Sequence, residues 1–188
     1  MKRIVIFASG SGSNAENLIR FFQNREDVHV THVFTNNPRA KVLERCKTLK
    51  TPALSFNREA FYKTDTVLDL LKICQPDMIV LAGFLWKFPE HILEQFTNKV
   101  INVHPALLPK YGGKGMYGMH VHEAVVAHKE TQTGITIHYV NEHYDEGAII
   151  FQATCPVNRN DSAKDVAAKI DTLEMTHFPE VVEKLLHE

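Results

Sequence analysis

The sequence predicts an α/β protein built on a single doubly wound, mostly parallel sheet flanked by helices, a Rossmann-like arrangement. Continuous apolar runs of strand length, such as Met78–Ala82, are typical of parallel strands that are covered on both faces. These runs alternate along the chain with segments of helical character. A glycine-rich turn, Ser9-Gly10-Ser11-Gly12, follows the first run, where phosphate-binding turns of such folds lie.

Apolar runs and turn residues predict the order of elements in the first hundred residues. We expect strands at residues 2–8, 28–35, 53–56, 78–82 and 100–103. We expect helices at residues 41–50, 58–73 and 89–96, and one that begins at Ser13. Strands and helices therefore alternate at the spacing of parallel βαβ units.

Two of these helices carry a recognisable start signal. Ser13 and Glu16 have the Ser-x-x-Glu spacing of a capping box, in which each side chain binds a backbone N–H at the start of the helix. Asn57 is the expected cap of the helix at 58–73. The apolar face of the first helix is expected to include Leu18, Phe21 and Phe22.

The pattern changes after Pro109. Four glycines within seven residues mark a segment that fits a flexible lid over a site and a loose loop equally well: Gly112, Gly113, Gly115 and Gly118. We then expect a helix at 120–128, strands at 133–140 and 148–157, and a last helix capped by Asp161-Ser162 that ends near Leu186. Because no repeat, low-complexity tract or linker is visible, residues 1–188 are expected to form one domain.

Composition excludes several classes of protein. The formal net charge is −1, with 21 basic and 22 acidic residues interspersed, which argues against a nucleic-acid binder. No apolar run approaches the ~20 residues of a transmembrane helix, and no signal peptide is expected because Ile4–Ala8 is too short for its apolar core. The three cysteines are far apart and odd in number, which fits a reducing compartment. We expect a cytoplasmic protein.

The glycine turn predicts a phosphate site. Gly10-x-Gly12-x-x-Ala15 joins a strand to a helix, so free backbone N–H groups and the positive end of the helix dipole meet there. Gly12, Ser13 and Asn14 are the candidate phosphate-binding residues, and Asn14 adds a side-chain donor. The second strand ends without an acidic residue that would bind the ribose of NAD. An NADP site is left as an alternative, because Arg39 follows the strand and could bind a 2′-phosphate.

Asn102 and His104 are the leading candidates for catalysis. Residues two apart on a strand point to the same face, so one amide and one imidazole project together from the strand tip. This pair suits acyl transfer, in which the amide binds a developing oxyanion and the imidazole moves or stabilises a proton. A structural Asn–His pair that ties down a loop is the alternative. Asp145 joins the candidates, although by itself it fits a plain turn residue.

Histidines elsewhere predict no metal site. His122 and His128 do not have the H-E-x-x-H spacing and the chain has no C-x-x-C, so we expect His120, His122 and His128 to be solvated or to face loops. On the strand at 133–140, Thr136 and His138 share one face, which fits a solvated surface but leads into the segment Asn141–Gly147 that contains Asp145.

Taken together, these motifs resemble the phosphoribosylglycinamide formyltransferase family. The resemblance runs in order through Ser9–Asn14, Pro76–Phe84, Asn102–Tyr111 and Thr133–Gly147. It implies that the catalytic Asn, His and Asp are Asn102, His104 and Asp145, and that Gly12, Ser13 and Asn14 hold the substrate phosphate. It further implies a folate-contacting Arg58, a pterin-pocket segment of Leu85, Trp86, Lys87 and Phe88 with a folate contact from Asn102, and a substrate-contacting Glu174.

The resemblance implies transfer of a formyl group from 10-formyltetrahydrofolate to the amine of glycinamide ribonucleotide. Folate is then a cosubstrate, and no metal, nucleic acid or membrane is required; the oligomeric state is left open. Leu85-Trp86-Lys87 replaces the Met-Arg-Ile that the family often carries, which affects the fine structure of the folate pocket. Alternatives are a formyltetrahydrofolate hydrolase, a methionyl-tRNA or sugar-nucleotide formyltransferase, and an NADP- or nucleotide-binding module. The hydrolase is expected to carry a domain before the first strand, and the tRNA enzyme a further C-terminal domain.

Overall fold

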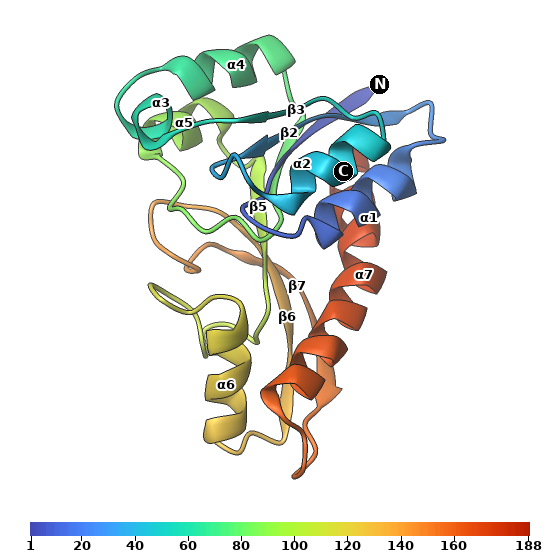
Figure 1. Cartoon of the computed structure of the whole chain (residues 1–188), viewed down its shortest axis with the longest axis vertical. Coiled ribbons are helices and arrows are strands. Elements are labelled where there is room, and N and C mark those ends of the chain that lie inside the picture. The colour runs from blue at the N-terminus through green and yellow to red at the C-terminus, as the bar shows by residue number, and fades with distance from the viewer.

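A seven-stranded sheet forms the centre of the computed structural model, which describes residues 1–188 (Figure 1). The strand order is β3-β2-β1-β4-β5-β6-β7. The first five strands pair in parallel, and β6 and β7 add an antiparallel edge. The strands are β1 Lys2–Phe7, β2 Val28–Thr35, β3 Ala53–Ser55, β4 Met78–Leu81, β5 Val100–His104, β6 Gln132–Tyr139 and β7 Ile149–Pro156. The doubly wound, mostly parallel sheet predicted from the sequence is confirmed.

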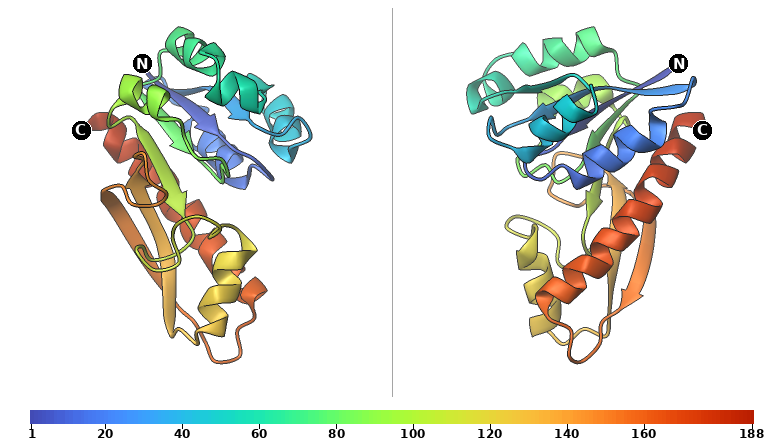
Figure 2. Two further views of the ribbon diagram at one scale, coloured as in Figure 1. Left: turned by 90° about the vertical axis from the view of Figure 1, so that its left-hand side faces the viewer. Right: turned by 45° about the vertical axis from the view of Figure 1, so that its right-hand side comes forward.

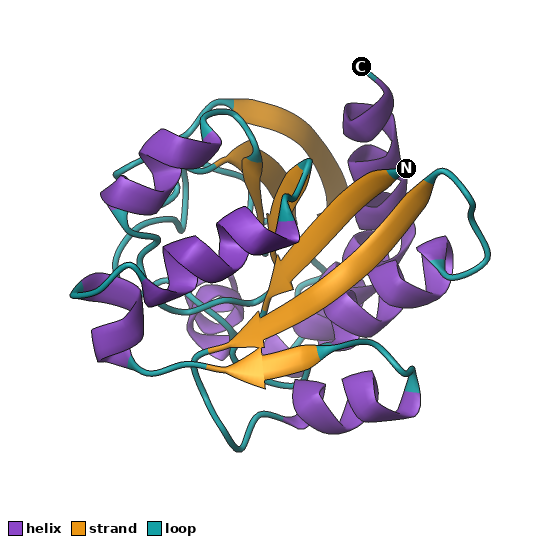
Figure 3. Ribbon diagram, turned by 90° about the horizontal axis from the view of Figure 1, so that it is seen from above, coloured by secondary structure: helices purple, strands orange, loops and turns teal.

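Helices cover both faces of the sheet, as Figure 3 shows from above. On β1, Ile4 and Ile6 enter one apolar core while Val5 and Phe7 enter the other, because alternate side chains of a strand point to opposite faces. The helices that contribute to the first core are α1 Ser13–Phe22, α2 Lys41–Thr48, α6 Met119–Ala127 and α7 Ala163–His187. Those that contribute to the second are α3 Arg58–Tyr62, α4 Thr66–Cys74 and α5 Glu90–Leu93, with a 3-10 turn at Glu94–Phe96.

The start of α1 differs from the expected capping box. The N-cap is Gly12, in the left-handed conformation, and no side chain caps the helix. The Glu16 carboxylate instead pairs with Arg20, at 2.7 Å, and with Arg45 of α2. The capping-box prediction is therefore wrong, because two guanidinium groups compete for the carboxylate that the box needs. The prediction that Phe21 belongs to the buried face of α1 is also wrong, because 38% of its surface is exposed to solvent.

Helix boundaries elsewhere follow the sequence with one exception. The Asn57 side chain accepts a hydrogen bond from the Ala60 N–H at 2.9 Å, so the predicted cap is confirmed. The helix predicted at 58–73 is broken into α3 and α4 at Lys63–Asp65. Ser162 caps α7 through a capping box with Asp165, so the cap predicted at Asp161-Ser162 is confirmed.

The long helix α7 links the two ends of the molecule. It runs from the β6–β7 end, beside α6, to the end where both termini lie (Figure 2). It packs against α1, α6, β6 and β7. None of the helices combines the length and apolar character that a membrane crossing requires.

The sheet has its switch point between β1 and β4. From β1 the chain first builds outward through β2 and β3, and then continues on the other side through β4 and β5. In open α/β sheets, ligands bind beyond the carboxyl ends of the strands at such a point. The turn after β1 and the segment after β4 are therefore the expected floor of a site.

Candidate active site

A cavity of about 550 Å³ lies at the switch point. Its walls come from the glycine turn after β1, the segment after β4, the end of β5, the glycine-rich segment before α6, and one face of α7. Asn102, His104 and Asp145 all line it, together with Asn14 and Glu174. The fold therefore brings candidates separated by up to 160 residues of sequence into one space.

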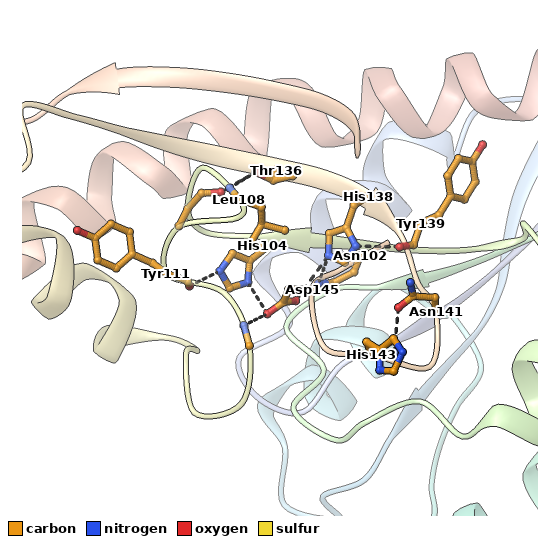
Figure 4. Close-up of polar contacts among 12 residues, drawn as sticks. Asn102, His104, Leu108, Tyr111, Thr136, His138, Tyr139, Asn141, His143 and Asp145 are labelled. Carbon is orange, nitrogen blue, oxygen red and sulfur yellow. Dashed lines mark hydrogen bonds and ion pairs between the residues drawn. The ribbon is translucent and has the colours of Figure 1, made fainter. Parts of the chain in front are cut away.

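Asn102 is held by a histidine that directly faces it on the neighbouring strand. β5 and β6 pair Asn102 with His138, and the amide nitrogen Nδ2 lies 3.1 Å from the ring nitrogen Nε2 (Figure 4). The other ring nitrogen, Nδ1, lies 2.9 Å from the Tyr139 carbonyl, to which it must donate. In the neutral ring Nε2 is then the acceptor, so His138 fixes which way the Asn102 amide points. One N–H of that amide stays available to the cavity.

His104 has one ring nitrogen occupied and one available. Nε2 donates to the Tyr111 carbonyl at 2.8 Å, and Nδ1 lies 3.5 Å from an Asp145 oxygen. Burial lowers the pKa of His104, whereas Asp145 and the Tyr111 carbonyl raise it; burial dominates, so the pKa lies below its ordinary value. At neutral pH the ring is therefore mainly neutral, and protons enter and leave it through Nδ1.

Asp145 lies between the two histidines. One carboxylate oxygen faces His104, and the other lies 3.6 Å from His138 Nε2. The Gly113 N–H donates to Asp145 at 2.9 Å, and a side chain on Gly112 would clash with Leu108 at 2.5 Å, so the turn packs tightly beneath the carboxylate. Burial raises the pKa of Asp145, but His138 and His104 in their protonated forms and the Gly113 N–H lower it by more, so the pKa lies below its ordinary value. The group is anionic at neutral pH.

The glycine turn presents unpaired backbone donors. The N–H groups of Gly12, Ser13 and Asn14 donate to no backbone acceptor in the chain. Gly12 has φ of +74°, and an added Cβ would lie 2.4 Å from a Val42 methyl group, so only glycine fits. Free N–H groups at the start of α1 form an anion-binding arrangement.

Asn14 and Glu174 form a buried polar pair behind this turn. Asn14 Nδ2 donates to the Glu174 carboxylate at 2.6 Å, so the side-chain donor expected to face a phosphate points to α7 instead. Burial raises the pKa of Glu174 to about 7, although the Asn14 bond acts in the opposite direction. The Asn14 Oδ1 and His122 Nδ1 atoms are buried without any partner in the chain, and both residues line the cavity. Buried polar atoms of this kind require a hydrogen-bond partner from outside the chain, either water or a polar ligand.

The Glu174 pKa predicts a pH-dependent stability. The unfolded carboxyl releases its proton near pH 4.5 and the folded one near pH 7. Between these values the folded state holds more protons, so the free energy of unfolding falls as pH rises, by about 3 kcal/mol over the interval. The free energy of unfolding is measured by denaturant titration at pH 5, 6 and 7, and we expect Glu174→Gln to abolish its decline with pH. Glu180→Gln is the control, because it removes an exposed carboxylate from the same helix, and we expect it to keep the decline. Equal slopes in wild type and Glu174→Gln would contradict the prediction.

The residues expected to contact folate lie in two groups. Leu85 is half exposed and lines the cavity. Arg58 lies outside the cavity and stacks on Trp86, with 5.2 Å between the guanidinium carbon and the ring centroid. Lys87 is exposed, and its carbonyl accepts a hydrogen bond from Tyr62, whereas the Phe88 side chain is buried in the second core. The structure therefore brings only Leu85 of these side chains to the cavity wall.

Comparison with known proteins decides the family. The sequence pattern of the family described as formyl transferase matches residues 2–182. The chain belongs to the formyl transferase family. It is 31% identical over 193 residues to the phosphoribosylglycinamide formyltransferase of Bacillus subtilis, covering 99% of this chain and 95% of that protein. It is 36% identical over 194 residues to the chloroplastic phosphoribosylglycinamide formyltransferase of Vigna unguiculata, and it spans 62% of the length of that relative.

Solved structures of formyl transferases have the same fold. The phosphoribosylglycinamide formyltransferase of Anaplasma phagocytophilum superposes with a TM-score of 0.90 at 30% identity, covering 100% of this chain and 87% of that one. The enzyme of the same name from Bacillus halodurans gives a TM-score of 0.87 at 34% identity, covering 98% and 95%. The formyl transferase resemblance predicted from the sequence motifs is confirmed.

Two histidines of this formyl transferase were misjudged from the sequence. His138 is 2% exposed and contacts Asn102, so the solvated alternative for its strand face is wrong; the Thr136 hydroxyl on that face donates to the Ala106 carbonyl at 2.7 Å. His122 was expected to be solvated or to face a loop, but it is 5% exposed on the cavity wall, because α6 packs against α7. The only signal for His138 was its alternation with Thr136.

Proposed function

We propose that this formyl transferase moves the formyl group of 10-formyltetrahydrofolate to the amine of glycinamide ribonucleotide, a step of purine biosynthesis. The proposal is supported above all by the convergence of Asn102, His104 and Asp145 in one cavity with a free-donor glycine turn. The names of the relatives agree with it. Both substrates are small molecules, and no step requires a metal.

The two ends of the cavity suit the two substrates. The N–H groups of Gly12, Ser13 and Asn14 bind the phosphate of the ribonucleotide, and Glu174 contacts the same substrate from α7. The formyl folate enters past Leu85, with the segment Leu85–Phe88 beside its pterin and Arg58 as a cation for its carboxylates. Asn102, near the end of β5, contacts the formyl group.

The chemistry follows from the available nitrogen atoms. The amine of the ribonucleotide attacks the formyl carbon, a C–N bond forms, and the carbonyl oxygen becomes an oxyanion. The free N–H of Asn102 donates to that oxygen. His104 Nδ1 takes a proton from the amine, and Asp145 stabilises the cation that results. The proton then passes to N10 of the folate as the bond between N10 and the formyl carbon breaks.

We also propose that residues 1–188 act as one formyltransferase domain, since both halves of the chain line the cavity. A cytoplasmic location is supported by three cysteines that form no disulfide.

A formyl-transfer assay tests the proposed function. Purified protein is mixed with 10-formyltetrahydrofolate, and the folate absorbance is followed with and without glycinamide ribonucleotide. Transfer predicts a change that requires the amine. A change without the amine would indicate a formyltetrahydrofolate hydrolase, and no change in either case would reject the proposal.

Replacing Asn14 by alanine is expected to act on one substrate. It leaves the Glu174 carboxyl without its hydrogen bond and loosens the first turn of α1 beside the phosphate. We expect the KM for glycinamide ribonucleotide to rise about tenfold while the folate KM changes less than twofold, because the turn that presents the phosphate-binding N–H groups loses its link to α7; a tenfold change corresponds to about 1.4 kcal/mol. Initial rates at varied concentrations of each substrate measure both constants. An effect on folate alone would show that the turn is misassigned.

A further inference from the structure

Three carbonyl groups of the glycine turn, those of Gly10, Ser11 and Gly12, each accept a hydrogen bond. The Gly10 carbonyl accepts from the Val42 N–H at 3.2 Å, and the Gly12 carbonyl accepts from the Glu16 N–H at 2.8 Å. The Ser11 carbonyl accepts from a side chain, Arg45 Nε, at 2.7 Å. Two of the three donors therefore belong to α2, a helix that does not line the cavity.

The Ser11 carbonyl is the one whose orientation is least constrained by the backbone. The peptide between Ser11 and Gly12 rotates about ψ of Ser11 and φ of Gly12, and glycine populates positive and negative φ with similar ease. A rotation of this peptide would replace the Gly12 N–H by a carbonyl oxygen at the anion site. An oxygen acceptor facing a phosphate dianion is repulsive, whereas an N–H is attractive.

The contacts of Arg45 oppose this rotation of the Ser11–Gly12 peptide. Its Nε binds the Ser11 carbonyl, and its Nη1 pairs with the Glu16 carboxylate in the first turn of α1. One planar guanidinium thus ties the turn to the helix that follows it, which fits the fork geometry of arginine. The Val42 side chain packs against Gly12 from the same helix. The cavity lining includes three carboxylic acids and Lys114 as its only lysine or arginine, so correct orientation of the N–H groups matters for binding an anion.

We propose that Arg45 is a positioning residue for phosphate recognition, because it holds the Ser11 carbonyl out of the anion site and so keeps the Gly12 N–H directed at the phosphate. The proposal rests on the proposed function for the identity of the substrate. It assigns to α2, outside the cavity, a role in the affinity for the phosphorylated substrate and none in the chemical step.

Arg45→Met tests the proposal, since methionine keeps much of the apolar stem and removes the donor. Arg20→Met is a matched control, because Arg20 pairs with the same Glu16 carboxylate and does not contact Ser11. We expect Arg45→Met to raise the KM for glycinamide ribonucleotide at least tenfold, with kcat within threefold and the folate KM within twofold of wild type. For the riboside that lacks the phosphate, kcat/KM is expected to change less than twofold. Arg20→Met is expected to match wild type in all four constants.

Calorimetric titration with ribose 5-phosphate gives a readout that does not depend on catalysis. Arg45→Met is expected to weaken this binding at least tenfold, and Arg45→Lys, which keeps a donor and the charge beside Glu16, to stay within threefold of wild type. Binding by Arg45→Met within twofold of wild type, or equal losses with the riboside and the ribonucleotide, would overturn the proposal. If wild type binds ribose 5-phosphate but transfers no formyl group, the proposed function fails while the role of Arg45 is still decided by the titration.

Discussion

Asn102→Ala is expected to lower kcat by about 10²–10³, which is the usual cost of removing one oxyanion donor. The amide has two N–H groups, and His138 takes one of them at 3.1 Å. The His138 ring is itself held by the Tyr139 carbonyl, so the second N–H keeps a fixed direction before substrate arrives. A donor that needs no reorientation stabilises charge in the transition state more than in the ground state. The loss is therefore expected in kcat more than in the KM of either substrate.

The measurement is steady-state formyl transfer, with thermal unfolding as the check on folding. Asn141→Ala is a suitable control, because Asn141 makes a local hydrogen bond to the His143 N–H and does not line the cavity. We expect this control to keep turnover within twofold of wild type. Near-normal turnover by a folded Asn102→Ala protein would remove Asn102 from the mechanism.

The features of the fold that could be predicted are the strands and helices that show a local pattern of apolar residues. Runs such as Met78–Leu81 are buried on both faces, so their sequence cannot belong to a solvated strand, and β4 lies in the centre of the sheet as expected. The parallel pairing of β1 to β5 followed from the alternation with helices, whereas the strand order came only from the structure. The first residue of α1, Ser13, was predicted correctly, but its cap could not be predicted, because Arg45, which binds the Glu16 carboxylate of the expected capping box, lies 29 residues away.

The site was predictable to the extent that its members share a strand or a motif. Asn102 and His104 alternate on β5, and both line the cavity. The support for these residues comes from segments that the sequence does not mark. Tyr111 acts through its backbone carbonyl, to which any residue type is equivalent, and His138 reaches Asn102 only because of the antiparallel register of β5 and β6. Residues 105–131 separate β5 from β6, so no hairpin turn fixes their register, and the pairing of Asn102 with His138 could not be read from the sequence.

Asp145→Asn is expected to lower kcat by at least about 10² while leaving the fold intact. Asparagine has nearly the same shape and can accept the Gly113 hydrogen bond through its carbonyl, so the turn is preserved. The charge beside His104 Nδ1, at 3.5 Å, is lost. That charge stabilises the imidazolium formed when the amine gives up its proton, and burial otherwise disfavours the cation. The variant therefore separates the electrostatic role of Asp145 from its role as a turn residue.

The pH profile gives the sign of this effect. His104 must be neutral to accept a proton at Nδ1, so kcat/KM is expected to rise with pH through the pKa of His104. Asp145 raises that pKa against the effect of burial. Without the charge the pKa falls, so the acid limb of the profile moves to lower pH while the plateau falls by at least two orders of magnitude. Glu146→Gln removes an exposed carboxylate from the next residue and is expected to keep both limb and plateau. If the acid limb of Asp145→Asn lay at the same pH as in wild type, the charge of Asp145 would have no effect on the pKa of His104, and the proposed role of Asp145 would be wrong.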